Sequence, residues 1–409
     1  MNKNKIINDP VYGFITIPSG VIFDVIQHPF FQRLRRIKQL GLTDFVYPGA
    51  LHTRFHHAIG AMHLMSITLE NLRYKGHYIS DEEFEAAQLA ILLHDIGHGP
   101  FSHTLEFSLL QGIRHEEISR MIISRLNEEL DGKLTLAQKI FDGRYERQFF
   151  HQLVASQLDI DRLDYLMRDS FFTGVSEGTI GADRIIKMLD VVDDQIVVEE
   201  KGIYSIENFL SARRLMYWQV YLHKTSVGAE KMLIELIRRA RKLTQQGANV
   251  QATPQFSFFL EQDISHQSFI EDPNIIDVFS ILDDTDIWAS IKYWLNHEDP
   301  VLQLLSSMLL QRRLFKIRLS NEKILKSEVV SLREKVSDAF KISHSESKYF
   351  VGQGDVSNSA YIAEGKTIKV LTKKGELIDV AQATDLPNIK AMSKIVKKHY
   401  LCWPKNITL

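Results

Sequence analysis

Cysteine is nearly absent from this chain of 409 residues, which holds Cys402 alone. A single thiol excludes an internal disulfide and is typical of a protein in a reducing compartment, so we expect a cytoplasmic location. Long apolar runs are also missing, and no stretch reaches the roughly 20 residues that a membrane-spanning helix needs. The opening MNKNKIINDPVYG lacks the apolar segment of a signal peptide. These absences predict no membrane partner.

A strong charge of either sign is missing as well. The chain has 49 Lys and Arg against 51 Asp and Glu, which gives a formal charge of -2. No overall field therefore favours nucleic acid as the main partner. Three local basic runs, at residues 33–38, 238–242 and 311–318, are interpreted as solvated helix faces.

What the sequence does have is helical periodicity. Apolar residues recur at helical spacing through most of residues 20–245, with Gly and Pro mainly between these stretches. The polar segment 244–257 indicates a boundary, and residues 367–382 are β-rich around a Lys-Gly turn. We predict a mainly α fold with a helical core over residues 1–245. A smaller C-terminal α+β region over residues 246–409 is expected to be helical and to end in a segment that contains a β-hairpin.

Three helices can be placed more closely. A capping box formed by Ser80 and Glu83 predicts a helix over about 81–94 or a little beyond. A second helix is predicted over QLDIDRLDYLMRDS, residues 157–170, and a third over about 205–224.

Histidines are numerous, and most of the 16 lie in the first third of the chain. They are densest in LLHDIGHGPFSH, residues 92–103, at the end of an apolar run. Ala87, Ile91, His94 and His98 are spaced to share one face of a helix that we expect to end near residue 98. Two imidazoles therefore interrupt an otherwise apolar stripe.

Burying such titratable groups is costly unless something pairs with them. Asp95 adjoins His94, and a bend at one of the two following glycines would let both side chains converge. Histidines with a carboxylate are a ligand set for a divalent metal. The alternative is a hydrogen-bonded core histidine, which we prefer for His63 and His77. The density of the HDxxH cluster favours a metal.

Several strings beyond this cluster resemble a known family. They are INDPVYG, FQRLRRIKQLG, YPGALHTRFHHAIG and IDRLDYLMRD, and they run from about Lys5 to about Lys224. The sequence resembles the HD-domain metal-dependent phosphohydrolases and is similar to their deoxynucleoside triphosphate (dNTP) triphosphohydrolase branch, which includes the SAM-and-HD-domain enzyme. We expect no counterpart of the SAM domain in this chain.

The resemblance implies four metal ligands: His57, His94, Asp95 and Asp161. Two imidazoles and two carboxylates suit Fe, Mn, Zn, Ni or Mg. A divalent metal is therefore the expected cofactor.

Phosphate binding needs cations besides the metal. Arg54 is placed to put a bidentate donor beside the metal, and the resemblance gives it that role. Arg162 stands where the family usually has a lysine, and Arg213 matches an arginine for the distal phosphates. For any one of the three alone we would prefer a surface ion pair, but not for all three.

Histidine suits the general acid that must protonate the leaving 5′-oxygen. We favour His103, with His115 as the other candidate beside the carboxylates of Glu106 and Glu116. His98 is expected to contact phosphate or to support the metal ligands.

The resemblance also implies a deoxyribose pocket, formed by Gln39, Leu40, Tyr165, Asp169 and Tyr221. Gln39 and Asp169 are suited to hydrogen-bond the 3′-hydroxyl. An aromatic ring packed at C2′ would leave no room for a ribose hydroxyl. Taken separately, the two tyrosines would be interpreted as core aromatics.

One position departs from the family pattern. Members that are activated by guanine nucleotide have an acidic residue shortly before the FQRLR string, whereas this chain has Gln27. Gln32 and Arg35 are kept. A nucleotide effector is therefore in doubt, while a homo-oligomer, either dimer or tetramer, is expected.

Three functions are compatible with the sequence. The main hypothesis is hydrolysis of a dNTP to deoxynucleoside and inorganic tripolyphosphate. The second is an HD phosphohydrolase acting on nucleoside monophosphates or cyclic nucleotides, which would not need Arg213. The third is a nucleotide-sensing or nucleic-acid-binding protein with vestigial hydrolysis, whose binding to nucleic acid would weaken steeply with salt.

Overall fold

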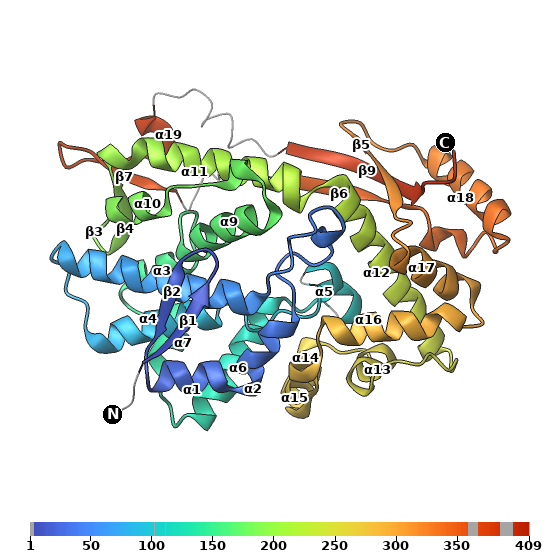
Figure 1. Ribbon diagram of the computed structural model, residues 1–409, viewed down its shortest axis with the longest axis horizontal. Helices are drawn as coiled ribbons and strands as arrows, with labels where there is room; N and C mark the ends of the chain where they lie inside the picture. Colours follow the sequence, from blue (N-terminus) through green and yellow to red (C-terminus); the bar gives the residue numbers. More distant parts are fainter. Residues whose placement is uncertain (1–3, 102, 111, 359–366, 385–395, 409) are drawn as a thin grey trace.

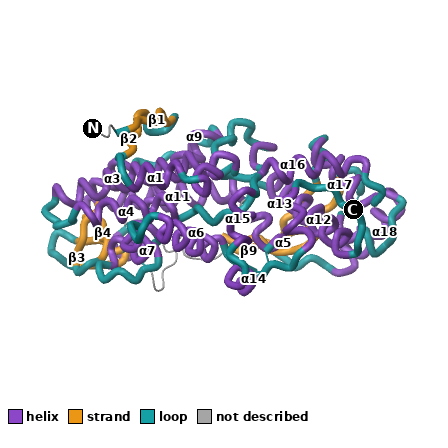
Figure 2. Tube along the Cα trace, turned by 90° about the horizontal axis from the view of Figure 1, so that it is seen from below, coloured by secondary structure: helices purple, strands orange, loops and turns teal. Residues whose placement is uncertain are grey.

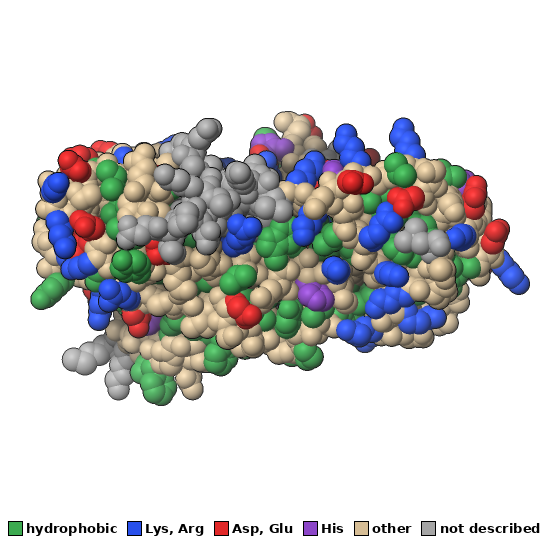
Figure 3. Space-filling model, turned by 90° about the horizontal axis from the view of Figure 1, so that it is seen from above, with side chains coloured by type: hydrophobic (Ala, Val, Ile, Leu, Met, Phe, Trp, Pro, Cys, Tyr) green, Lys and Arg blue, Asp and Glu red, His purple; other side chains and the backbone are tan. Residues whose placement is uncertain are grey.

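The computed structural model describes residues 4–101, 103–110, 112–358, 367–384 and 396–408. The molecule is elongated and mainly helical, with three small sheets among the described residues, which confirms the predicted fold class (Figure 1). No helix of these ranges is long and apolar enough to cross a membrane. The face drawn in Figure 3 carries Lys and Arg interspersed with Asp and Glu, and the largest gathering of basic side chains lies at the end formed by the C-terminal region.

The chain begins with an antiparallel hairpin that stands out from the body (Figure 2). Short helices then lead to the first long helix, and a glycine-bearing stretch between the two short 3-10 turns changes the direction of the chain. These elements are β1 (Lys5–Asp9), β2 (Gly13–Ile17), α1 (Val21–Gln27), α2 (Pro29–Gln32), η1 (Arg33–Arg36) and η2 (Thr43–Phe45).

Three helices position the candidate site. The long helix α3 packs against both α4 and α9, and the three are lined by buried aliphatic side chains. Their bounds are α3 (Arg54–Tyr74), α4 (Asp81–Leu93) and α9 (Ile160–Thr173). The other helices of this part are α5 (His103–Leu109), α6 (His115–Glu129), α7 (Thr135–Phe141), α8 (Gln148–Val154), η3 (Ser176–Gly178), α10 (Ala182–Met188) and η4 (Glu200–Gly202).

Helix α4 begins as its sequence predicts. The backbone N–H of Ser80 donates to the carboxylate of Glu83 over 2.8 Å, and Glu83 N–H donates back to the Ser80 hydroxyl over 3.1 Å. Its end was predicted too late, because the helix stops at Leu93 and His98 does not share its face. A Cβ at Gly97 would lie 2.3 Å from the His115 carbonyl oxygen, so the chain turns away here to pass close to α6.

The predicted helix over residues 205–224 is also corrected. Helix α11 (Ile203–Met216) ends in a π-helical turn, Tyr217–Tyr221, and a new helix, α12 (Lys224–Gln245), follows. The ring nitrogen Nδ1 of His223 accepts a hydrogen bond from the backbone N–H of Thr225 over 3.2 Å and so caps α12. Such side-chain caps mark a helix start, and here the apolar periodicity runs through the break and hides it.

The rest of the chain forms helices and the remaining strands. Helix α12 packs against α17 and β5, and β9 lies between β5 and β6. The elements are α13 (Pro254–Glu261), α14 (His266–Glu271), α15 (Asn274–Ile281), α16 (Asp284–Tyr293), η6 (Trp294–Asn296), α17 (Pro300–Leu310), β5 (Phe315–Ser320), α18 (Lys326–Phe340), η7 (Ser347–Tyr349), β6 (Gly352–Asn358) and β9 (Val396–Pro404).

The segment expected to hold a hairpin returns to the first part of the molecule. Strands β7 (Lys369–Leu371) and β8 (Leu377–Asp379) pair antiparallel, and β7 also pairs parallel with β4. The resulting sheet has the order β3-β4-β7-β8, with β3 (Leu189–Val192), β4 (Gln195–Glu199) and the short helix α19 (Val380–Ala383) beside it. The boundary near residue 245 stays a prediction.

Candidate active site

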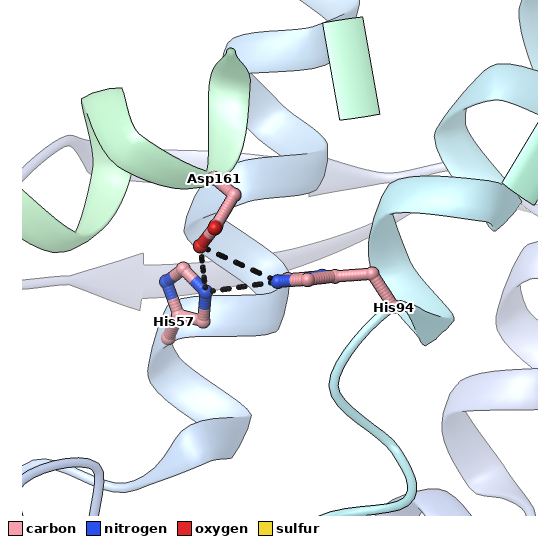
Figure 4. Close-up of side chains that lie close together, drawn as sticks. All are labelled: His57, His94 and Asp161. Carbon is pink, nitrogen blue, oxygen red and sulfur yellow. Dashed lines mark hydrogen bonds and ion pairs between the residues drawn. The ribbon is translucent and has the colours of Figure 1, made fainter. Parts of the chain in front are cut away.

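Three side chains from three helices converge on one point (Figure 4). Nε2 of His57, on α3, lies 3.4 Å from Nε2 of His94, at the end of α4. Oδ1 of Asp161, in the first turn of α9, lies 3.2 Å from the first nitrogen and 3.4 Å from the second. His94 and Asp161 follow His57 by 37 and 104 positions in the sequence, and the three ligand atoms could hold one metal ion.

Both imidazoles are oriented by hydrogen bonds at their other nitrogen. Nδ1 of His57 lies 2.7 Å from the buried carboxylate of Asp164, and Nδ1 of His94 lies 2.6 Å from the carbonyl oxygen of Ile91. Each acceptor favours the tautomer that carries its proton on Nδ1 and leaves the Nε2 lone pair directed at the centre. This arrangement is the one that metal-ligating histidines usually have.

Behind Asp164 lies a chain of charges that the sequence analysis missed. The guanidinium of Arg168 donates to Asp164 over 2.9 and 3.0 Å and to Asp9 over 2.8 Å. Arg168 is completely buried, and Asp9 belongs to the N-terminal hairpin. The spacing of Asp161, Asp164 and Arg168 along α9 was the available signal, since residues three or four apart share a helix face.

The electrostatics of the three converging groups favour a bound cation. Burial alone would lower the pKa of His57, but its hydrogen bonds with Asp161 and Asp164 raise it to about 10. Burial opposes ionisation of Asp161, yet its hydrogen bonds with His57 and His94 hold its pKa far below the usual range. The surrounding carboxylates thus attract positive charge, and a divalent ion would supply that charge.

Asp95 lies at the edge of this group. Its Oδ1 is 3.4 Å from Nε2 of His94 and its Oδ2 is 3.9 Å from Nε2 of His57. Oδ2 also forms an ion pair with Nη1 of Arg54. Burial would raise the pKa of Asp95, but His94, Arg54 and His98 hold it well below its ordinary value. An ionised Asp95 can therefore both bind a metal ion and pair with Arg54.

The donor set fits a divalent metal of the kind predicted. Two imidazole nitrogens and two carboxylates, all buried or partly buried, match the preferences of the predicted Fe, Mn, Zn, Ni and Mg ions. The ligand atoms of His57, His94 and Asp161 all lie within 4.8 Å of one another, and Asp95 forms a second such group with His98 and His115. The four ligand roles remain a prediction that this geometry supports.

The histidines predicted for proton transfer lie beside this cluster. The rings of His98 and His115 stack with centroids 3.7 Å apart, and Nδ1 of His115 lies 3.0 Å from Glu106 and 3.6 Å from Glu116. Burial and the charge of Arg54 hold the pKa of His98 well below its usual value, so this ring is neutral near pH 7. The side chain of His103 lies outside the described residues.

One cavity of about 570 Å³ contains most of the predicted site. Its walls include two predicted metal ligands, two of the three predicted phosphate-binding arginines, two histidines and all five predicted sugar residues, namely Asp95, Asp161, Arg54, Arg162, His98, His115, Gln39, Leu40, Tyr165, Asp169 and Tyr221. Tyr217 also lines the cavity, and the guanidinium of the buried Arg213 lies 6.0 Å from its ring centre.

The residues predicted to bind the sugar include a hydrogen-bonded network around Asp169. The hydroxyl of Tyr221 donates to Asp169 over 2.8 Å, and the rings of Tyr221 and Tyr165 meet edge to face with centroids 6.0 Å apart. Nε2 of the buried His52 lies 2.7 Å from the other oxygen of Asp169. Sequence reasoning assigned no role to His52, although this residue lies within the recognised YPGALHTRFHHAIG string.

The start of α16 also reaches the site, although no motif marked it. Asp284 accepts backbone hydrogen bonds from Lys38 and Phe101, each over 2.9 Å. Arg33 donates to the carbonyl oxygen of Leu282 over 2.8 Å. The C-terminal region therefore fixes both the stretch that precedes Gln39 and the loop that follows His98.

Comparison with known proteins agrees with this architecture. The HD domain family matches residues 54–168, and the HD associated region matches residues 180–253. The uncharacterized protein YwfO of Bacillus subtilis (strain 168) is 30% identical over all of this chain and 94% of its own length. The crystal structure of a phosphohydrolase from Bacteroides thetaiotaomicron VPI-5482 is 53% identical, covers 98% of this chain and 100% of its own, and superposes with a TM-score of 0.96.

A further relative carries a more specific name. The deoxynucleoside triphosphate triphosphohydrolase SAMHD1 homolog of Dictyostelium discoideum is 33% identical over 58% of this chain, and this match spans half the length of that relative. The chain matches both family regions, and it matches the relative from Bacillus subtilis over nearly the whole length of that relative. This chain therefore belongs to the HD-domain metal-dependent phosphohydrolases, in the branch that resembles the deoxynucleoside triphosphate triphosphohydrolases.

Proposed function

We propose that the protein hydrolyses deoxynucleoside triphosphates to deoxynucleoside and inorganic tripolyphosphate. The observation that supports this most is the shared cavity, in which predicted metal ligands, phosphate-binding arginines and sugar-binding residues line one space. A substrate that needed only a metal and one phosphate would leave much of this wall without a role. The relative from Dictyostelium discoideum bears the name of this activity.

His57, His94, Asp95 and Asp161 would hold the divalent ion. When bound, such an ion polarises a phosphoryl group and activates water for attack on the phosphorus nearest the sugar. Arg54 stands beside these ligands through its ion pair with Asp95 and lines the cavity, so its guanidinium would bind a phosphate oxygen. Arg162 and Arg213 would neutralise and align the rest of the triphosphate.

Proton delivery to the leaving 5′-oxygen needs a histidine that holds a proton near neutral pH. The lowered pKa of His98 makes it a hydrogen-bond partner rather than a donor of this proton. We therefore propose His103 as the acid, with His115 as the second candidate because Glu106 lies 3.0 Å from its Nδ1 and can orient the ring. Glu116 would assist at 3.6 Å.

Selection for the deoxy sugar follows from the aromatic wall. Tyr165 and Tyr221 present rings to the cavity, and Tyr221 is held by its hydrogen bond to Asp169. A ring packed against C2′ excludes a 2′-hydroxyl, while Gln39 and Asp169 would hydrogen-bond the 3′-hydroxyl. Leu40 would complete the apolar side of the sugar pocket.

Self-association is part of the same proposal. The protruding hairpin exposes Ile6 and Phe14, with 66% and 76% of their surfaces accessible. Both would be buried if a second copy packs on this hairpin. Light scattering should show a dimer or tetramer for the wild type and a smaller species for Phe14→Ser, whereas equal masses would contradict the contact.

The reaction is tested by its products. The protein is incubated with each dNTP and with Fe, Mn, Zn, Ni or Mg, and the phosphates are separated by anion exchange. Release of tripolyphosphate is expected, and release of pyrophosphate or single phosphate would overturn the proposal. His57→Ala should abolish turnover, while the matched control His63→Ala alters another histidine of the same helix and should retain it.

A further inference from the structure

Two charged side chains line the cavity without a role in the reaction proposed above. Glu230 and Lys231 form part of its wall together with Ile234, and all three lie on α12. Neither carboxylate oxygen of Glu230 has a hydrogen bond or ion pair within the described part of the chain. The ammonium of Lys231 lies 5.5 Å from the ring centre of Tyr400. A half-buried carboxylate without a partner is costly unless a ligand pairs with it.

The position of this pair follows from the path of the chain. Gln39 and Leu40, proposed for the sugar, lead through Gly41 into the 3-10 turn Thr43–Phe45, and that turn packs against α12. Gly41 and Thr43 line the same cavity as the proposed sugar residues and Glu230. The chain that carries Gln39 and Leu40 therefore leads to the helix that carries the carboxylate.

The charges that act on Glu230 differ from those that act on the proposed sugar residue Tyr165. Burial raises the pKa of Glu230 to about 7, and the charge that opposes this rise is that of Lys231. By contrast, burial and the neighbouring Tyr217 raise the pKa of Tyr165, and the charges of Arg162 and Arg213 oppose the rise. A nucleotide with its phosphates at the arginines and its sugar at Tyr165 would extend its base toward α12.

We propose, building on the dNTP triphosphohydrolase function, that Glu230 and Lys231 read the nucleotide base and select guanine. Guanine presents two adjacent donors, N1–H and N2–H, next to the acceptor O6. A carboxylate accepts both donors in parallel, and an ammonium donates to O6.

The other bases fit this pair less well. Adenine and cytosine offer one exocyclic amino group next to ring acceptors, so one carboxylate oxygen of Glu230 would lack a donor. Thymine offers a single N–H between two acceptors. A site built to form such bonds rejects analogues that leave its buried polar groups unpaired.

The test compares kcat/KM for dGTP, dATP, dCTP and TTP. The wild type should prefer dGTP, and Glu230→Gln should lower kcat/KM for dGTP by roughly 10- to 100-fold, because the amide places a donor against the donors of guanine. The values for the other three dNTPs should change by less than about 3-fold. The matched control is Glu235→Gln on the same helix, because Glu235 pairs with Arg238 over 2.6 Å and does not line the cavity.

Lys231→Met should also lose activity selectively with dGTP. An equal loss with all four dNTPs would overturn base reading, since it would mean that Lys231 binds phosphate or that Glu230 only supports the fold. Equal kcat/KM for the four dNTPs in the wild type would overturn it too. Circular dichroism checks folding, and Glu230→Asp, which keeps the carboxylate, should retain more of the dGTP preference than Glu230→Gln.

The same measurements separate this inference from the proposed function. If all four dNTPs release tripolyphosphate at equal rates, guanine selection falls and the triphosphohydrolase function stands. If dGTP is preferred and the preference disappears in Glu230→Gln, but the product is pyrophosphate, base reading stands and the proposed function falls.

Discussion

Asp164 accepts a hydrogen bond from Nδ1 of His57 over 2.7 Å, and neither side chain has any exposed surface. The contact joins two helices, α9 and α3, through the histidine predicted to ligate the metal. Arg168 holds Asp164 from behind and reaches Asp9 of the N-terminal hairpin. The hairpin, the core and the candidate metal centre are thereby linked by consecutive charge-assisted hydrogen bonds.

We therefore expect Asp164→Asn to weaken metal binding by about 10- to 100-fold, as is typical when the partner of a metal-ligating histidine is changed. The amide oxygen can still accept from Nδ1 but contributes no charge, so His57 becomes a weaker ligand. Titration with Mn or Fe, followed by metal analysis, measures the change. Asp183→Asn, at an exposed position of α10, is the control. Equal affinity in both variants would show that Asp164 does not tune the site.

Metal binding should also stabilise the fold. A ligand that binds only the native state at 100 times its Kd adds about 2.7 kcal/mol to the free energy of unfolding. We expect Tm to rise when a suitable divalent ion is added to chelator-treated protein and to fall again with excess chelator. In Asp161→Asn the rise should disappear, because one of the three converging ligands loses its charge. A rise of the same size in that variant would place the ion elsewhere.

The sequence predicted the features that depend on local pattern or on a long motif. The capping box of Ser80 and Glu83 gave the start of α4 because both partners lie within one helical turn. The convergence of His57, His94 and Asp161 across three helices was inferred because the flanking strings resemble a family, not because spacing alone required it. The mainly α class followed from the apolar periodicity.

Other features depend on contacts that no local pattern reveals. Periodicity runs through His223, so the break before α12 was missed, and with it the placement of Glu230 on a cavity wall. His52 and Asp284 act on residues more than 100 positions away, at Asp169 and Phe101. An isolated histidine or aspartate carries no signal of such a partner. Sequence strings shared with a family therefore identify the side chains at the reaction centre, but they do not identify the residues that position those side chains.

Asp284 should make the stability of the protein depend on pH. Burial raises its pKa from the ordinary 3.8 to about 6, although hydrogen bonds from Lys38 and Phe101 oppose the rise. Between about pH 4 and 6 the native state therefore keeps a proton that the unfolded state has released, so the contribution of this group to stability falls as the pH rises through that window. Above about pH 7 the contribution is constant, because Asp284 is then ionised in both states.

Urea unfolding of the wild type and Asp284→Asn across pH 4 to 7 tests this linkage. The free energy of unfolding of the variant should fall less between pH 4 and 6 than that of the wild type, because the amide does not titrate. Near pH 4 it should also be less stable than the wild type, by about 1–3 kcal/mol, since one of the two backbone N–H groups loses its acceptor, and this difference should shrink toward pH 7. Asp277→Asn, on an exposed face of α15, should match the wild type. Parallel pH profiles for all three proteins would contradict the assigned role.

Arg213 offers a change that should separate stability from activity. Its side chain is buried, and its Nε and Nη1 have no hydrogen-bond partner among the described residues. Arg213→Met removes a buried charge and two unpaired donors, so the free energy of unfolding should rise, by about 1 kcal/mol or more. Its kcat/KM for a dNTP should fall roughly 10- to 100-fold, the equivalent of a lost hydrogen bond between a charged donor and phosphate.

The paired measurement also decides between the proposed reaction and its main rival. An enzyme for nucleoside monophosphates or cyclic nucleotides would keep its turnover in Arg213→Met, because such substrates lack distal phosphates. Arg214→Met is the control, since the Arg214 side chain is partly exposed, whereas that of Arg213 is buried. A higher Tm with unchanged turnover of the preferred substrate would favour the rival. A higher Tm with lost dNTP hydrolysis would mean that the unpaired cation of Arg213 destabilises the free protein but is needed to bind the triphosphate.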